Sequence, residues 1–177
     1  MYGATSSTDI PIQNGFQATH GGGSALYVSY NGANFDNAGV DIYVAKFSAN
    51  GQQLLASTYV GGSENDGVNY NNFGGNYPSG SQYDSLTSNY GDQFRGEIML
   101  DALGNCIIAS SSRSSNFPTA NAIQPTIGGM QDGVIFKLNS DFSALLFSTF
   151  IGGSNNDACY SVKIDSSYNI VFSGGSS

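Results

Sequence analysis

A ten-residue phrase occurs twice in this chain of 177 residues, and this repeat constrains the fold more than any single residue does. Residues 57–66 read Ser-Thr-Tyr-Val-Gly-Gly-Ser-Glu-Asn-Asp, and residues 148–157 read Ser-Thr-Phe-Ile-Gly-Gly-Ser-Asn-Asn-Asp, at an offset of 91. Segments 41–47 and 132–138 match at the same offset. Because each repeat corresponds to one supersecondary unit, the chain is predicted to contain several copies of one structural element.

Two further matches show that the copies differ in length. Ile10, Pro11 and Gln17 match residues 117, 118 and 124 at an offset of 107, and residues 100–105 match 164–169 at an offset of 64. The decrease from 107 to 91 and then to 64 indicates insertions of 16 and 27 residues in the first copy. They fall within about 23–40 and 67–91, so the second copy is the plain repeat.

The composition excludes one class of partner. Charged residues make up only 10% of the chain, and the net charge is −8 with five Lys and Arg residues. No basic patch can neutralise a phosphate backbone, so nucleic-acid binding is not expected. The uncharged polar surface is common in secreted β-rich repeat proteins. Neither a transmembrane run of 18 apolar residues nor a signal peptide is present, so any export signal is expected upstream.

The second copy reads as four short strands separated by turn residues, and no long helix is expected. The predicted strands are 134–138, 144–151, 160–164 and 169–173. They are apolar on both faces, which predicts that each small sheet is sandwiched between neighbours. Cys106 and Cys159 fall in apolar strand-like runs and are expected to be buried free thiols, with a disulfide as the open alternative.

Segments 134–138, 144–154 and 162–167, with Asp157 between them, resemble the bacterial SBBP repeat, a β-propeller repeat. Residues 3–11 resemble the link between blades in the same family. The resemblance implies an all-β fold with blades of four antiparallel strands, and a secreted or cell-surface bacterial protein without shared catalytic residues. Tyr168 stands where the family usually has Gly, so a strained left-handed conformation is expected there.

By analogy with related propellers, the strand that ends at Asp165 is innermost and the Thr149 strand is outermost. The predicted organisation is the end of a link plus an outer half-blade with two insertions in 1–91, a complete blade in 92–153 and an inner half-blade in 154–177. The strand edges beside 41–47 and 169–173 are then expected to be bare. Neighbouring blades of the same polypeptide, or other copies arranged head-to-tail, are the expected partners.

Two oxygen-bearing residues of the first insertion, Asn34 and Asp36, and Asp41 directly after it are candidate calcium ligands. Their spacing lacks the pattern of an EF-hand loop, and no other cofactor is expected. The repeated Asp66 and Asp157 are predicted to cap turns through backbone N–H groups.

The chain shows no Ser-His-Asp arrangement and no phosphate-binding loop, so a non-enzymatic module is the expected function. The alternative is a carbohydrate-active enzyme with Glu97 or Asp101 as acid or base. For Glu97, an ion pair with Arg95 is the structural interpretation.

The second insertion carries a set of aromatic residues between Asn, Gly and Ser. This mixture is typical of recognition loops and also suits stacking on sugar rings. A scaffold, adhesion or ligand-binding module that contacts a surface protein or a glycan is therefore expected, with a loop that has no partner as the alternative. The candidate ligand-binding residues are Tyr70, Phe73, Tyr77, Tyr83 and Tyr90.

Overall fold

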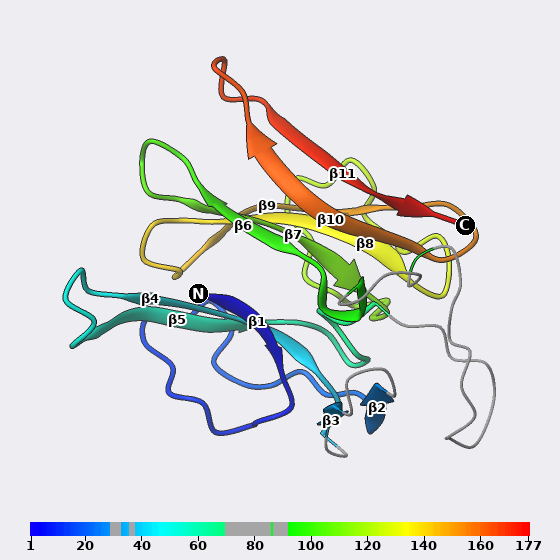
Figure 1. The fold of residues 1–177 in the computed structure, drawn as a ribbon, viewed down its shortest axis with the longest axis horizontal. Helices are drawn as coiled ribbons and strands as arrows, with labels where there is room; N and C mark the ends of the chain where they lie inside the picture. Colours follow the sequence, from blue (N-terminus) through cyan, green and yellow to red (C-terminus); the bar gives the residue numbers. More distant parts are fainter. Residues whose placement is uncertain (29–32, 36–37, 70–85, 87–91) are drawn as a thin grey trace.

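The computed structural model describes residues 1–28, 33–35, 38–69, 86 and 92–177, and these residues form antiparallel β-sheets (Figure 1). Their only helical element is a 3-10 turn, η1 (Asp92–Phe94), which confirms the predicted all-β class. The strands are β1 (Tyr2–Thr5), β2 (Leu26–Val28), β3 (Ala33–Phe35), β4 (Asp41–Phe47), β5 (Leu54–Val60), β6 (Glu97–Leu100), β7 (Cys106–Ser112), β8 (Asp132–Leu138), β9 (Leu145–Ile151), β10 (Asp157–Ile164) and β11 (Ile170–Ser176).

Three sheets follow one another along the chain. The N-terminal sheet has the order β1-β4-β5, the central sheet β6-β7-β8-β9 and the C-terminal sheet β10-β11. β2 and β3 form a separate hairpin within the first insertion. The central sheet is the four-stranded antiparallel unit that the repeat predicts, and it lies within residues 92–153.

The N-terminal sheet has one strand more than the sequence predicts. β1 pairs with β4, with Tyr2 opposite Val44 and Thr5 opposite Asp41, so the expectation of a bare edge beside 41–47 is wrong. Residues 2–5 are the counterpart of the end of β7, because Ala109 stands opposite Ile135 in the same register. Four residues that read as a link are too few to show a strand period.

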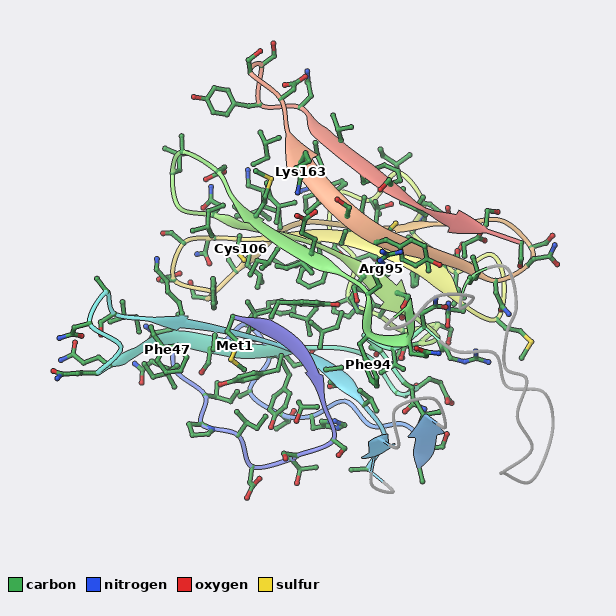
Figure 2. The ribbon with its side chains drawn as sticks, in the orientation of Figure 1. Met1, Phe47, Phe94, Arg95, Cys106 and Lys163 are labelled. Carbon is green, nitrogen blue, oxygen red and sulfur yellow. The ribbon has the colours of Figure 1, made fainter. Side chains whose placement is uncertain are left out.

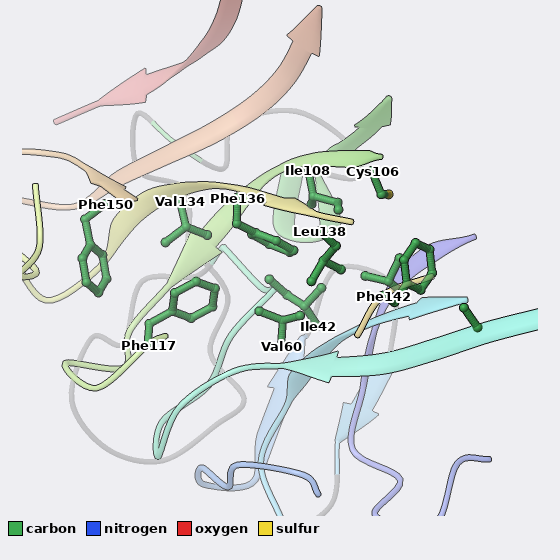
Figure 3. Close-up of a cluster of buried hydrophobic side chains, with 12 residues drawn as sticks. Ile42, Val60, Cys106, Ile108, Phe117, Val134, Phe136, Leu138, Phe142 and Phe150 are labelled. Carbon is green, nitrogen blue, oxygen red and sulfur yellow. The ribbon is translucent and has the colours of Figure 1, made fainter. Parts of the chain in front are cut away.

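The central sheet is covered on both faces, as its doubly apolar strands predict. One face packs on the N-terminal sheet, through the cluster of buried side chains in Figure 3. The other face packs on the C-terminal sheet through a second cluster. The first cluster joins Ile42, Val44, Ala56 and Val60 to Cys106, Ile108, Phe117, Val134, Phe136, Leu138, Phe142 and Phe150. The second joins Ile107, Ala109 and Ile135 to Cys159 and Val162.

Successive sheets turn the same face toward the sheet before them. Val134, Phe136 and Phe150 of the central sheet face the N-terminal sheet. Their counterparts at the offset of 91 are Tyr43, Ala45 and Tyr59, which form a cluster on the opposite side of the N-terminal sheet from the central sheet. Ile10 and Ile12 cover that cluster. The sheets are therefore related by a repeated step in one direction, and not by a twofold axis.

The turns of two equivalent hairpins, β6–β7 and β10–β11, have the same hydrogen bonds and the same backbone conformation. Asp101 Oδ1 accepts hydrogen bonds from the N–H groups of Leu103 and Asn105, and Asp165 does the same with Ser167 and Asn169. The residue before each Asn is left-handed, with φ of 78° at Gly104 and 65° at Tyr168. The strained conformation expected at Tyr168 is confirmed.

Candidate functional site

The repeated phrase closes a turn in each copy through its final aspartate. Gly62 N–H donates to Asp66 Oδ2 at 2.7 Å, and Gly153 N–H donates to Asp157 Oδ2 at 2.7 Å. Asp66 also accepts from the hydroxyls of Ser112, the last residue of β7, and of Ser114 in the segment that follows β7. The predicted capping role of both aspartates is therefore confirmed, and in the first copy the cap also joins two sheets.

A second aspartate in each copy, together with a glutamine, links the loop before one strand to the loop after the next strand. In the second copy these strands are β8 and β9. Asp132 accepts hydrogen bonds on both carboxylate oxygens, from Gly128 N–H (2.9 Å) and Gln124 Nε2 (2.8 Å) on Oδ2 and from Gly129 N–H (3.1 Å) on Oδ1. Gln124 Oε1 in turn accepts from Gly152 N–H at 3.1 Å. The Gln and Asp side chains thus fix three segments of the repeat.

The counterpart in the first copy, Asp41, is less well satisfied. Its Oδ2 accepts from Gly21 N–H at 2.6 Å and from Gln17 Nε2 at 3.5 Å, whereas its buried Oδ1 has no hydrogen-bond partner among the described atoms. Gly22 N–H donates to His20 Nδ1 instead. Burial raises the pKa of Asp41 to about 7, although the hydrogen bond from Gly21 opposes the shift.

Of the candidate calcium ligands, only Asp41 has a described side chain. Asn34 lies in β3 with its side chain outside the described set, and Asp36 lies outside the described residues altogether. Within the described parts of the chain, no group of three or more His, Cys, Asp or Glu side chains is arranged to hold a metal ion.

Glu97 is held in its ionised form by three donors on β10, the strand that carries Lys163 (Figure 2). It forms an ion pair with Lys163 and accepts from Ser161 Oγ and from Val162 N–H at 2.9 Å. These contacts, the one from Lys163 first, lower the pKa of Glu97 to about 2. The expectation of an ion pair with Arg95 is wrong, because the cation that pairs with Glu97 is Lys163. The Arg95 guanidinium lies 5.4 Å from the centre of the Tyr160 ring.

Asp101 is also committed to structural contacts. Burial raises its pKa, but the ion pair with Lys137 at 2.8 Å and the hydrogen bonds from Asn105 and Leu103 outweigh burial and lower the pKa below its usual range. A general acid must carry its proton near the working pH. Glu97 and Asp101 are therefore poorly suited to that role at neutral pH.

All five aromatic residues proposed to bind a ligand, Tyr70, Phe73, Tyr77, Tyr83 and Tyr90, lie outside the described residues. The insertion that carries them has one described residue between 70 and 91, Leu86, and this residue is buried. Its carbonyl oxygen accepts from Asn69 Nδ2 at 2.8 Å and from the Tyr160 hydroxyl at 2.6 Å. Gln131 Nε2 donates to Asn69 Oδ1 at 2.7 Å and completes a buried polar network.

This network attaches the second insertion to both the central and the C-terminal sheets. The sequence did not predict it, because Asn69, Gln131 and Tyr160 share no motif and their proximity depends on how the sheets stack. A buried amide pair of this kind is costly unless each polar atom is bonded, so it fixes the position of Leu86.

The two cysteines are free and buried, as expected, and they lie in different clusters. Cys106 belongs to the cluster between the N-terminal and central sheets (Figures 2 and 3), and Cys159 to the cluster between the central and C-terminal sheets. Burial raises the pKa of each thiol to about 12, so neither is a reactive thiolate.

No helix within the described residues is long and apolar enough to cross a membrane. A scan against protein-family models and a search of curated proteins both gave no match to this chain.

Proposed function

We propose that this chain is a repeat segment of a β-propeller, similar to the SBBP repeat, that acts without catalysis as a scaffold, adhesion or ligand-binding module of a secreted or cell-surface bacterial protein. The observation that carries the proposal is the repeated, same-sense stacking of the three sheets. Blades of a propeller turn the same face toward the preceding blade. Under this proposal, the central sheet is a complete blade and its neighbours are parts of two others.

The absence of a catalytic role is supported by the state of the acidic residues. Glu97 and Asp101 are ionised and held by donors. Asp41 and Asp66 have a raised pKa, but both are fully buried and cannot reach a substrate. An acid catalyst needs a raised pKa together with an exposed position, and neither Asp41 nor Asp66 is exposed.

The binding element of the proposed module is the second insertion. Its attachment through Leu86 gives the aromatic segment a fixed base on the scaffold. Aromatic side chains provide large contact areas at low entropic cost, so a fixed base favours recognition of a glycan or a surface protein.

Binding to a glycan panel and to intact bacterial cells tests this function, with product analysis for hydrolysis in the same samples. Binding without turnover is expected, and replacement of the five aromatic residues by Ser abolishes it. The exposed Tyr168, replaced by Ser, is the control, because it lies outside the insertion. Hydrolysis that is lost on Glu97→Gln would instead establish the enzyme alternative.

A calcium-stabilised module is a second candidate, and the buried Oδ1 of Asp41 is the observation that favours it. A cation beside this oxygen would satisfy it, as a proton would at lower pH. The test is the melting temperature at pH 8 with calcium or with a chelator. A rise with calcium that Asp41→Asn removes supports this candidate, since a ligand of the folded state raises the midpoint.

A further inference from the structure

A groove of about 400 Å³ opens between the end of the central sheet and the C-terminal sheet. Its lining comes from residues 151–153, 157–159, 172 and 174–176. Phe172 in its wall is 42% exposed, which is unusual for a phenylalanine on the inner part of a stacked sheet. Among the described strands β11 pairs only with β10, and its other edge, which is free of them, lies next to this groove.

The counterpart of this groove, between the N-terminal and central sheets, is filled by the segment that follows β7. Asn116 Oδ1 accepts from Ser63 N–H at 2.8 Å. Ser114 Oγ accepts from Glu64 N–H at 2.9 Å and donates to Asp66 Oδ2 at 2.8 Å. Two side chains of the segment thus form hydrogen bonds with the backbone and with the capping aspartate of the repeated phrase.

The next residue of the segment, Phe117, fills the apolar part of the same space (Figure 3). It is 3% exposed, and its ring centre lies 6.0 Å from that of Phe136 and 6.1 Å from that of Phe150. It shares this cluster with Val60 and Ile108, one from each of the two sheets. Pro118 follows, and its carbonyl oxygen accepts from the Ser148 hydroxyl.

The open groove has the same polar wall as the filled one. Asp157 stands where Asp66 does, and Gly153, Ser154 and Asn155 are the counterparts of residues 62–64. The chain follows the same path along this wall as far as Ser177, whose N–H donates to the Asn156 carbonyl at 3.1 Å. The matching bond in the filled groove runs from Arg113 N–H to the Asn65 carbonyl at 3.2 Å.

One pair of equivalent glycines shows most clearly that one groove is filled and the other is open. A Cβ atom placed on Gly62 would collide with Ser114 and Asn116. A Cβ placed on Gly153 has no described atom within 4 Å, and Gly153 is exposed where Gly62 is buried. The wall that binds a Ser-x-Asn-Phe-Pro segment is therefore present twice, and the described residues cover it once.

We propose that this groove is a docking site for a polypeptide segment of the form Ser-x-Asn-Phe-Pro followed by a β-strand. The Ser hydroxyl binds Asp157, the Asn oxygen binds the Ser154 N–H, and the Phe ring packs on Ile151 and Phe172. The strand that follows pairs with the free edge of β11, as β8 pairs with β7. The inference goes beyond the proposed surface role, because it depends on neither the location of the protein nor the second insertion.

The test uses a fluorescent synthetic peptide with the sequence of residues 113–138, titrated with the full chain and followed by fluorescence anisotropy. Saturable binding is expected, together with slower amide hydrogen exchange at residues 170–176. Gly153→Val fills the space above the wall without backbone strain and weakens binding at least tenfold. Replacement of Asn116 and Phe117 by Ala in the peptide has the same effect, since both then lose their contacts.

Gly3→Val is the matched control, because its Cβ also meets no described atom and it lies in β1. It leaves peptide binding unchanged. Circular dichroism and melting establish that Gly153→Val is folded; if it is not, Phe172→Ser replaces it. Equal binding by Gly153→Val or by the Ala peptide overturns the proposal, as does no binding at all. Self-association of the chain that Gly153→Val abolishes, without peptide binding, overturns it in favour of a second copy.

Discussion

His20 accepts the backbone hydrogen bond that would otherwise complete the carboxylate of Asp41. Gly22 N–H donates to His20 Nδ1 at 3.2 Å, whereas the corresponding Gly129 N–H donates to Asp132 Oδ1 at 3.1 Å. Because Nδ1 accepts, the ring proton is on Nε2, which donates to the Thr5 carbonyl at 3.1 Å. The counterpart of His20 in the second copy is residue 127, an isoleucine, which cannot accept such a bond.

This arrangement predicts that stability falls as the pH rises from about 4 to about 7. The unfolded chain loses the Asp41 proton near the usual pKa of about 4, whereas the folded chain keeps it until about pH 7. Between these values unfolding releases a proton, so the free energy of unfolding decreases with pH. Burial also raises the pKa of Asp66 to about 7, although its hydrogen bonds oppose the shift, so Asp66 adds to this trend. Urea unfolding at several pH values measures it.

Asp41→Asn isolates the Asp41 contribution, and His20→Ile, which introduces the residue of the second copy, tests the role of His20 in it. His20→Ile frees Gly22 N–H to donate to Asp41 Oδ1 and lowers the pKa of that carboxyl. The slope of stability against pH between 4 and 7 becomes shallower, even where the lost contact with Tyr59 reduces the absolute stability. An unchanged slope in both His20→Ile and Asp41→Asn would show that Asp41 does not carry the effect.

The hydrogen bond between the bridging Gln and the Asp carboxylate is shorter in the second copy than in the first. Gln124 Nε2 lies 2.8 Å from Asp132 Oδ2, whereas Gln17 Nε2 lies 3.5 Å from Asp41 Oδ2. Gln124→Ala is expected to cost about 1–3 kcal/mol of stability, since it leaves buried polar groups without a partner. Gln17→Ala is expected to cost less. Equal costs in denaturant unfolding would contradict the geometry.

Tyr168 is expected to be a site of easy stabilisation. Its φ of 65° is unfavourable for a residue with a side chain, and it is 69% exposed, so the ring contributes little packing. Tyr168→Gly is expected to raise stability by about 0.5–1 kcal/mol, and the converse Gly104→Tyr to lower it. Thermal melts of both variants against the parent measure the two signs, and a destabilising Tyr168→Gly would indicate a packing role for the ring.

The regular parts of the fold were predictable because the same strand and turn residues occur in both copies of the repeat. The β8–β11 segments, the left-handed Tyr168 and the capping Asp66 and Asp157 all follow from local pattern and turn chemistry. The offsets between copies also located both insertions without any reference to structure.

Features that depend on contacts between distant segments were not predictable. β1 is four residues long and is recognisable only from the register of its partner β4. The anchoring of Leu86 joins residues 69, 131 and 160, whose proximity arises only when the sheets stack. The ion pair of Glu97 with Lys163 likewise crosses between sheets, so sequence proximity favoured Arg95 instead.

The middle sheet is covered on both faces by successive copies, and two thiols report on the two interfaces separately. Cys106 and Cys159 are each buried, in the clusters on opposite faces of that sheet. The direct measurement is the rate at which an excess of thiol reagent labels each cysteine in native buffer, resolved by peptide mapping. Both thiols are expected to react only as fast as the whole chain unfolds in native buffer, and promptly in denaturant. Rapid labelling of either cysteine in the folded protein would contradict the stacking at that face.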